Sequence, residues 1–187
     1  MTSLNQSATQ QFDYCWHPLK RVAKQRIPKA LWPWLAQTAS LTHCLRQAGH
    51  LEVQVLEDCW GKATHREQRR LGLHPREAVR VRTVLLHVDG IPVVYGRSII
   101  PARSLRGHWR FLTHLGSKPL GGYLYRQTRQ TRSRIEITRL PAGILSHRTE
   151  ALWARRSVFY GYGPGVLVNE AFFPEIDTLQ PPKLTYE

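Results

Sequence analysis

The sequence predicts a single α+β domain in which helices pack on an antiparallel β-sheet built from hairpins. Three observations lead to this class. Alternating apolar runs come in pairs separated by turn dipeptides, and helical patterns lie between the pairs. The chain of 187 residues, 42% of them hydrophobic, is long enough for one sizeable core. No apolar run approaches the ~20 residues that a membrane-spanning helix needs.

Three parts are expected along the chain. Residues 1–27 are polar and predict a flexible extension, residues 28–176 form the domain, and residues 177–187, with Pro181 and Pro182, form a loose tail. The first thirty residues hold no hydrophobic stretch followed by a cleavage site, so we expect a cytoplasmic protein.

The first part of the domain has a helical pattern over residues 28–49. Ser40 is a candidate N-cap for a helix that Gly49 ends. Glu52–Asp58 then alternates like a strand. The highly charged residues 61–77 predict a surface loop or a lid.

A β-hairpin is the clearest local signal. Val79–Val88 and Val93–Pro101 are rich in β-formers, and Asp89-Gly90 between them is a hairpin turn dipeptide. Ser104–Leu115 then predicts a helix with its apolar residues inward. Lys118–Gly122 predicts a turn.

The last part of the domain predicts more strands. Arg134–Leu140 reads as one strand, and Arg155–Tyr162 and Val166–Phe173 flank Gly163-Pro164-Gly165 as a second hairpin. Strands that come in hairpins make an antiparallel sheet and exclude a doubly wound one.

The charge alone leaves several partners open. Lys and Arg total 27 against 13 Asp and Glu, a formal charge of +14 that suits nucleic acid, an acidic membrane surface or a small polyanion. Between Arg97 and Arg156 there are 13 basic residues and two acids, Glu136 and Glu150. The three cysteines lack C-x-x-C spacing and are expected to be reduced.

Motifs for cofactors are absent from the sequence. It has no phosphate-binding G-x-x-x-x-G-K-[ST], no G-x-G-x-x-G between a strand and a helix, and no G-x-S-x-G nucleophile elbow. It has no H-E-x-x-H and no cluster of Cys and His. We therefore expect neither a nucleotide cofactor nor a metal.

Glu170 is the first candidate functional residue. Strand alternation places it on one face with the apolar residues Val166, Val168 and Phe172. A carboxylate that faces a core must be paired or hydrogen-bonded. Two readings are open: a structural ion pair with an arginine, or a group that handles a proton or binds a hydroxyl in a pocket.

Arg82 is the second candidate, since its same-face neighbours Val84 and Leu86 are apolar. If Asp89-Gly90 is a two-residue loop and Pro92 does not shift the register, Arg97 lies directly opposite Arg82. Two cations in that position repel each other unless they share an anion, and a guanidinium group suits a carboxylate. A buried arginine, a buried glutamate and few other acids indicate a small anionic ligand.

Four blocks of the sequence resemble the chorismate pyruvate-lyase family. They are, in order, Arg82–Pro101, Leu115–Gly121, Trp153–Ser157 and Asn169–Pro174. The resemblance covers residues 28–174. It implies a chorismate lyase-like domain, acting as a monomer, with helical flaps over a buried ligand pocket. Residues 30–49 and 117–134 are the candidate flaps.

The resemblance also implies an activity. The family eliminates pyruvate from chorismate and leaves 4-hydroxybenzoate, the first committed step toward ubiquinone in many bacteria, with no metal or organic cofactor. Carried over, Arg82 would bind the ring carboxylate, the backbone at Leu120 would add N–H donors, and Glu170 would meet the ring hydroxyl. Leu41 matches a substrate contact where the family often has methionine.

The family reaction suits a basic pocket, because chorismate is a dianion. We expect Arg97, Arg155 or Arg156 to stabilise the carboxylate of the departing enolpyruvyl group. Glu170 could assist loss of the C4 proton, and an intramolecular transfer to the enolpyruvyl group is equally allowed. A pocket that grips both ends of the ring also predicts slow release of 4-hydroxybenzoate and product inhibition.

Two other classes of function compete with this one. Effector-binding domains of some transcription regulators share the family's fold, but they follow a DNA-binding module of ~70 residues, and only ~28 polar residues precede the first helix here. A nucleic-acid-binding protein is the other, given the +14 charge and six Trp. Excess charge outside the pocket could also contact an acidic membrane surface.

Overall fold

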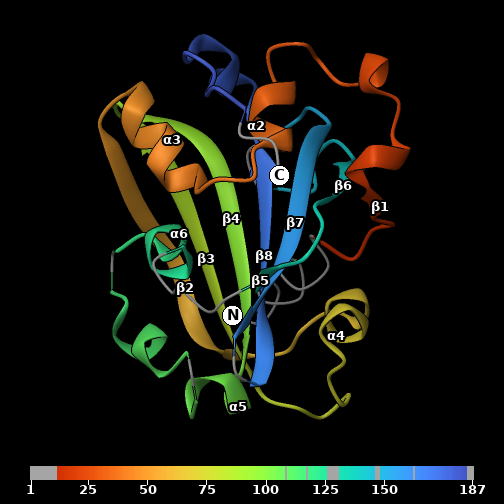
Figure 1. Ribbon diagram of the computed structural model, residues 1–187, viewed down its shortest axis with the longest axis vertical. Coiled ribbons are helices and arrows are strands. Elements are labelled where there is room, and N and C mark those ends of the chain that lie inside the picture. Colours follow the sequence, from red (N-terminus) through yellow and green to blue (C-terminus); the bar gives the residue numbers. More distant parts are fainter. Residues whose placement is uncertain are drawn as a thin grey trace.

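The computed structural model describes residues 12–107, 109–116, 118–125, 131–145, 148–161 and 163–184. One antiparallel sheet organises these residues, with the strand order β1-β6-β7-β8-β4-β3-β2 and β5 paired with β7 (Figure 1). Its strands are β1 (His17–Pro18), β2 (Leu51–Gly61), β3 (Val79–Val88), β4 (Ile91–Pro101), β5 (Thr131–Arg132), β6 (Glu136–Leu140), β7 (Leu152–Gly161) and β8 (Gly163–Phe172). The predicted α+β class is confirmed.

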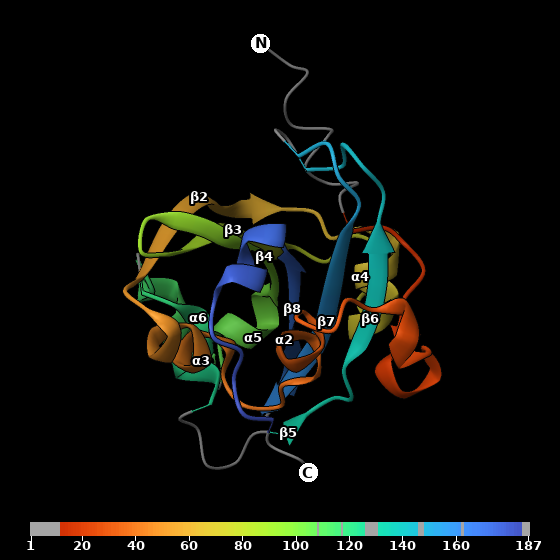
Figure 2. The same ribbon diagram turned by 90° about the horizontal axis from the view of Figure 1, so that it is seen from above.

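Helices cover both faces of this sheet. The α-helices are α2 (Trp32–Ala36), α3 (Leu41–Ala48), α4 (His65–Leu71), α5 (Ala102–Leu105) and α6 (Leu120–Leu124). Short 3-10 helices are η1 (Leu19–Arg21), η2 (Lys24–Arg26), η3 (Arg110–His114) and η4 (Pro174–Thr178). Helices α2, α3, α5 and α6 lie within the concave face of the sheet (Figure 2). Among these described helices, none is long and apolar enough to cross a membrane.

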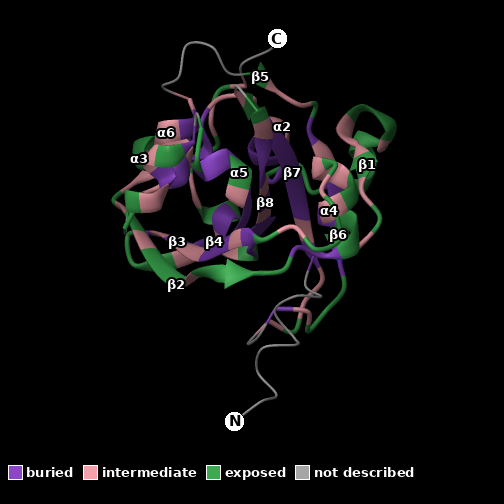
Figure 3. Ribbon diagram, turned by 90° about the horizontal axis from the view of Figure 1, so that it is seen from below, coloured by how far each residue is buried: buried purple, intermediate pink, exposed green. Residues whose placement is uncertain are grey.

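Two apolar clusters occupy the concave face, and two occupy the other. On the concave face, one cluster joins α2 and α3 to the end of the sheet around Leu86 and Phe172. The second cluster joins α5, η3 and α6 to the opposite end, around Ile100 and Val166. Buried residues are concentrated in β4, β7 and β8, whereas the edge strand β2 is largely exposed (Figure 3). The middle of the concave face lies between these two clusters and belongs to neither of them.

Local signals for α3 and the first hairpin are confirmed. The Ser40 side chain accepts a hydrogen bond from the His43 N–H at 3.4 Å, and Gly49 follows the last residue of α3. Asp89 and Gly90 have positive φ angles of 51° and 80°, which the tight turn between β3 and β4 requires.

The register of this hairpin differs from the prediction. The pairing of β3 with β4 shifts by one residue on the turn side of Leu86, next to Pro92. Arg82 therefore pairs with Ser98, and Arg97 pairs with the residue after Arg82. The prediction that Arg97 lies opposite Arg82 is wrong, because one extra residue in a strand moves every later side chain to the other face.

The charged segment 61–77 holds a helix instead of the predicted loop or lid. A capping box begins α4: the Thr64 Oγ1 accepts the Glu67 N–H at 3.2 Å, and the Glu67 carboxylate accepts the Thr64 N–H at 2.9 Å. Gly72, with φ 63°, ends the helix. The T-x-x-E spacing of this capping box is present in the sequence.

The predicted helix over Ser104–Leu115 is split into α5 and η3. Its expected inward residues are nevertheless buried, including Trp109 and Leu112. Gly107 follows α5 and disfavours continuation of a helix. In the segment predicted as a turn, Leu120 begins the short helix α6.

The two ends of the chain are more packed than expected. Phe12 is fully buried and stacks on Tyr95 at a ring distance of 6.0 Å, and β1 pairs with β6. At the other end, the Lys183 carbonyl accepts a 2.9 Å hydrogen bond from Gln37 Nε2. The boundaries expected at residues 27 and 177 therefore fall inside the packed structure, because Phe12 brings apolar area that the sheet buries. The rest of both predicted segments, 1–11 and 185–187, lies outside the described residues.

Candidate active site

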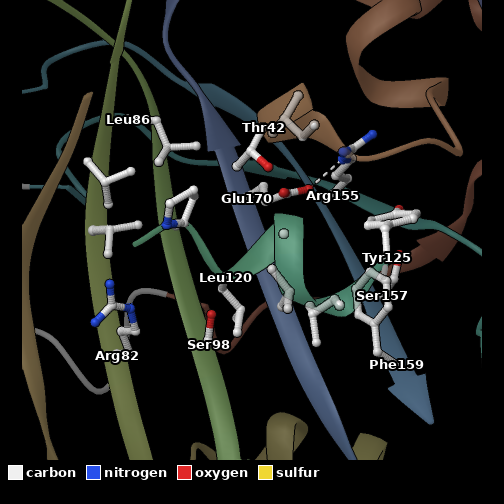
Figure 4. A pocket seen from close by; sticks show the side chains of 18 of the residues that line it. Thr42, Arg82, Leu86, Ser98, Leu120, Tyr125, Arg155, Ser157, Phe159 and Glu170 are labelled. Carbon is white, nitrogen blue, oxygen red and sulfur yellow. Dashed lines mark hydrogen bonds and ion pairs between the residues drawn. The ribbon is translucent and has the colours of Figure 1, made fainter. Parts of the chain in front are cut away.

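A pocket lies on the concave face of the sheet, between the two apolar clusters and beneath α3 and α6 (Figure 4). Its floor consists of two neighbouring rows of side chains that cross β3, β4, β8 and β7. The first row is Arg82, Ser98, Val168 and Ser157, and the second is Val84, Gly96, Glu170 and Arg155. The cavity has a volume of about 50 Å³, so the pocket is narrow.

Arg82 and Glu170 lie at opposite ends of this floor (Figure 4). They are two strands and two residues apart, which places their Cβ atoms roughly 12 Å from each other. Gly96 lies between them on β4 and contributes no side chain, so the floor is open at that point. The sequence-based prediction that both residues face inward is confirmed.

Arg82 is held by one carboxylate and one carbonyl. It is 3% exposed, its Nη1 donates to Asp58 Oδ2 at 2.8 Å, and its Nη2 donates to the Lys118 carbonyl at 3.3 Å. Asp58 also accepts from Arg80 Nε at 2.5 Å. Because a single acid serves two guanidinium groups, this end of the pocket keeps an excess of positive charge.

Helices α3 and α6 meet above the floor. Leu41 and Leu120 both line the pocket, as the resemblance implies. A Cβ atom at Gly121 would lie 2.9 Å from Thr42 Oγ1, so any larger residue there would force the Thr42 side chain to move. The Tyr125 hydroxyl then donates to the Thr38 carbonyl at 2.8 Å, and this ties the end of α6 to the loop before α3.

Glu170 is paired and also lines the pocket, so its ion pair with an arginine is confirmed, and its role toward a proton or a hydroxyl stays a prediction. Its Oε2 accepts from Arg155 Nε at 2.6 Å (Figure 4). Arg155 is 1% exposed, and its Nη1 donates to the carbonyls of Trp34 at 2.7 Å and Gln37 at 2.9 Å. These bonds fix the Glu170 carboxylate against β7 and the end of α2.

Arg132 is a pocket residue that the sequence did not single out. Its Nε donates to Ser157 Oγ at 3.0 Å, and its Nη1 donates to the Thr38 carbonyl at 2.9 Å. The guanidinium carbon also lies 5.4 Å from the centre of the Phe159 ring. The only sequence signal was its place in the acid-poor stretch, which it shares with many other arginines.

Arg97, one of the predicted pocket arginines, lies on the opposite face. Its Nε donates to Glu67 Oε1 at 3.0 Å, and Asn169 Nδ2 donates to the same oxygen at 3.1 Å. Glu67 is 0% exposed, so this ion pair is buried beneath α4. The register shift in the first hairpin is the reason, since it turns Arg97 away from Arg82.

Arg156 also lies on the opposite face, because it follows the inward-facing Arg155 on the same strand. Its Nε donates to Glu136 Oε2 at 2.9 Å, and its guanidinium carbon lies 4.7 Å from the centre of the Trp16 ring. Burial works to raise the pKa of Glu136, but the guanidinium groups of Arg70 and Arg156 outweigh it and hold that pKa below its usual range. Burial lowers the pKa of Arg156.

The pocket carries a positive balance of charge. In the part of the chain that the structure describes, three guanidinium groups line it, those of Arg82, Arg132 and Arg155, against one carboxylate, Glu170. Burial raises the pKa of the Tyr125 hydroxyl, which therefore remains a neutral donor. No group of three or more metal-ligating side chains occurs among the described residues. The arrangement can hold an anionic ring at one end and accept a hydrogen bond from it at the other.

Comparisons with known proteins identify relatives of this chain. Residues 15–179 match the family model described as chorismate lyase. A protein named probable chorismate pyruvate-lyase from Azoarcus sp. (strain BH72) is 39% identical over 170 residues, which cover 83% of this chain and 88% of that protein. A protein of the same name from Aromatoleum aromaticum is 38% identical, with coverage of 84% and 92%.

The fold also occurs in proteins of a different class. The ligand-binding domain of a putative GntR-family transcriptional regulator from Bordetella bronchiseptica superposes with a TM-score of 0.51 and 20% identity, over 68% of this chain and 85% of that domain. At this identity the likeness concerns the fold alone.

Proposed function

The chain belongs to the chorismate lyase family and is a pyruvate-releasing lyase, and from that premise we propose that it converts chorismate into 4-hydroxybenzoate and pyruvate. One observation carries the proposal: Arg82 and Glu170 lie at opposite ends of a narrow pocket whose lining is rich in guanidinium groups. The substrate matches this polarity, because its ring carboxylate and its hydroxyl lie on opposite carbons of a six-membered ring.

Ring binding follows from the two ends of the pocket. The guanidinium group of Arg82 takes the ring carboxylate as a pair of parallel hydrogen bonds. The backbone N–H at Leu120 adds a donor, since no side-chain oxygen caps the first turn of α6. The carboxylate of Glu170 accepts the hydrogen bond of the ring hydroxyl. The apolar side chains of Val84, Leu120 and Val168 contact the ring faces.

The bond changes need no oxidant or reductant. The C4–H bond gives up its proton, the bond between C3 and the enolpyruvyl oxygen breaks, and a C3–C4 double bond forms that completes the aromatic ring. The leaving enolpyruvate takes up a proton at its methylene carbon and becomes pyruvate. Because aromatisation drives the elimination, positioning and charge stabilisation suffice, and we propose that no metal or organic cofactor takes part.

Charge on the leaving group requires a cation near C3, beside the Glu170 end of the pocket. Of the three arginines that the sequence offered for this role, only Arg155 faces the pocket. Arg132 is its neighbour there, because its Nε bonds Ser157 two residues along the same strand face. We assign the enolpyruvyl carboxylate to this pair, Arg155 and Arg132.

Two routes are open to the C4 proton. Glu170 can accept it, since its carboxylate already lies at the hydroxyl end of the pocket and is held by Arg155. The enolpyruvyl methylene can instead take it directly within the substrate. The first route makes Glu170 a general base, and the second makes it only a hydroxyl-binding group.

The product fits the same site as the substrate. The carboxylate and hydroxyl of 4-hydroxybenzoate occupy the same two ends as those of chorismate, so we propose tight retention of product and inhibition by it. A role in ubiquinone synthesis follows from the product. Trp34 and Trp109 are fully buried and cannot stack on bases, whereas Trp60 is exposed.

One assay tests the proposal directly. Purified protein is mixed with chorismate, and pyruvate and 4-hydroxybenzoate are followed separately. We expect the two products to appear in equal amounts, and in an Arg82→Ala variant we expect the rate at low substrate to collapse. Binding of 4-hydroxybenzoate without any turnover of chorismate would instead assign the chain to the ligand-sensing class.

A further inference from the structure

A row of buried polar side chains lies on the face of the sheet opposite the pocket. We call it the polar row, and its members are Arg97 on β4, Asn169 on β8 and Arg156 on β7. Arg97 pairs with Asn169 across the strands, and Asn169 pairs with Arg156. Asn169, in the middle, is 0% exposed. The proposed reaction does not use this row.

Each member of the polar row is the chain neighbour of a residue that lines the pocket. The pairs of neighbours are Gly96–Arg97, Glu170–Asn169 and Arg155–Arg156. Because side chains alternate between the two faces of a strand, the polar row lies directly behind the Glu170 end of the pocket floor. A shift of the strands at this row therefore moves the Glu170 carboxylate as well.

Apolar side chains flank the polar row on both sides along the same strands. These buried neighbours are Tyr95, Ala171 and Ala154 to one side, and Ile99, Leu167 and Val158 to the other. Apolar residues in the row itself would have joined these two clusters into one core, and replacing a buried ion pair by apolar residues is often neutral or stabilising. Polar residues at this one level therefore indicate a requirement other than stability.

Glu67 of α4 joins the row into one hydrogen-bonded unit. Its Oε1 accepts from Arg97 Nε at 3.0 Å and from Asn169 Nδ2 at 3.1 Å, and its Oε2 accepts from Arg97 Nη2 at 3.3 Å. Asn169 Nδ2 also donates to the Arg97 carbonyl at 3.3 Å, which links β8 to β4 in addition to their backbone hydrogen bonds. Because these groups are buried, water does not compete for the bonds that hold the two strands together.

On the pocket face, glycine occupies the matching position of β4. Gly96 pairs with Glu170, and it offers neither a side chain to contact Glu170 nor a stiff backbone. Arg155, on the other neighbouring strand, bonds the Glu170 carboxylate at 2.6 Å. The position of β8 against β4 at this level is therefore set from behind, through Asn169.

We propose that Asn169 is a positioning residue for the reaction. With Glu67 and Arg97 it fixes the strand that carries Glu170, and so it sets the place of the carboxylate relative to the hydroxyl of the bound ring. This inference rests on the proposed function and assigns the polar row a part in it. Positioning matters at this scale, since a displacement of about 1 Å can cost ~10²-fold in the rate of an enzyme.

The first test measures how well the pocket distinguishes 4-hydroxybenzoate from benzoate. Dissociation constants from calorimetry need no turnover, and their ratio reports the hydrogen bond between the ring hydroxyl and Glu170. We expect benzoate to bind about 10-fold more weakly than 4-hydroxybenzoate in the wild type and about 2-fold more weakly in Asn169→Ala. Benzoate itself should bind both proteins equally within about 2-fold, because Arg82 is two strands away. If Asn169→Ala does not fold, Asn169→Ser, which keeps a hydroxyl donor, should give a ratio between these two.

Thr138→Ala is the matched control. The Thr138 hydroxyl is also buried on the far face and donates to the Cys15 carbonyl at 2.8 Å, but it lies on β6, two strands from Glu170. Both variants lose a buried hydrogen bond and should lower the midpoint of urea unfolding. The control should keep the ratio of the wild type. A ratio that shrinks equally in both variants would indicate general loosening and would overturn the positioning role.

The second test asks whether Asn169 acts through Glu170. The ratio is expected to be small already in Glu170→Gln, and the addition of Asn169→Ala should then change it by less than about 2-fold, because the group that Asn169 positions is gone. A fall as large as the one in the wild-type background would contradict this coupling.

The outcomes separate this proposal from the one on which it rests. A wild-type protein that distinguishes the two ligands but releases no pyruvate from chorismate overturns the proposed function, and the ratios still decide the role of Asn169. A wild-type protein that consumes chorismate, beside an Asn169→Ala variant with an undiminished ratio, overturns the positioning role alone. Equal binding of both ligands by the wild type removes Glu170 from hydroxyl binding and overturns the positioning role with it.

Discussion

Arg155 Nε lies 2.6 Å from Glu170 Oε2, on a neighbouring strand, so the carboxylate at the hydroxyl end of the pocket is held in place before any ligand arrives. The same guanidinium group donates to three carbonyls in and just after α2. The pair thus links the floor of the pocket to the helices that close it. A fixed carboxylate of this kind can accept a proton without first reorganising.

Replacement of Glu170 by Gln tests whether that carboxylate is a base. The amide keeps the size of the side chain and can still accept the ring hydroxyl, but it cannot take the C4 proton at neutral pH. We expect kcat to fall by about 10²-fold with KM changed only a few-fold. Steady-state pyruvate release measures both, and a kcat within a few-fold of the wild type would assign the proton to the intramolecular route.

Replacement of Arg82 by Ala tests the carboxylate anchor. Loss of a charge-assisted, two-point contact should raise KM for chorismate by about 10²-fold, and Arg82→Lys should recover only part of the loss because an ammonium lacks the fork. Arg80→Ala is the matched control, since Arg80 shares Asp58 with Arg82 but does not line the pocket. An equal rise in KM for both variants would contradict the anchoring role.

Product analogues test the two ends of the pocket separately. We expect 4-hydroxybenzoate to inhibit initial rates in competition with chorismate. Benzoate lacks the hydroxyl that Glu170 accepts, so it should bind about 10-fold more weakly, a loss typical of one hydrogen bond to a charged group. In the Glu170→Gln variant the difference between the two inhibitors should shrink. Inhibition constants from the pyruvate assay decide this, and equal constants for the two compounds in the wild type would remove Glu170 from hydroxyl binding.

Replacement of Glu67 by Gln tests the buried ion pair behind the pocket. Arg97 would then keep a buried charge without its carboxylate, and we expect a loss of about 3–5 kcal/mol in the free energy of unfolding. Glu77→Gln is the control: its partner Arg103 is largely exposed, and the loss should stay below about 1 kcal/mol. Urea unfolding measures both. Equal losses would show that the burial of Arg97 does not matter.

The lowered pKa of Glu136 predicts that the free energy of unfolding depends on pH. Burial works to raise its pKa, but two guanidinium groups outweigh burial and lower that pKa in the folded chain from its ordinary value of 4.5. The unfolded state therefore binds the proton more tightly, and the stabilisation present above pH 4.5 is lost as the pH falls through the folded-state value. Glu136→Gln should flatten this acid limb in unfolding curves recorded between neutral and acidic pH. An unchanged slope would contradict the assignment.

Local sequence signals determined much of the fold and both ends of the pocket. Strand alternation is enough to place Arg82 and Glu170 on apolar faces, and the turn at Asp89 and Gly90 defines the first hairpin. The N-cap at Ser40 and the capping box of α4 are also visible in the sequence. These features depend on residues a few positions apart, so short-range geometry fixes them.

Tertiary structure alone decided which arginines share the pocket. A single bulged residue between the turn and Arg97 sends that side chain to Glu67 on the far face, because sheet register inverts with each added residue. Arg132 enters the pocket from β5, and no pattern around it distinguishes it from its basic neighbours. The sequence by itself thus determined that a few arginines face inward around one rare acid. Strand pairing and helix packing between residues far apart in the sequence decided which of these arginines lie together. Short-range sequence patterns encode neither of these.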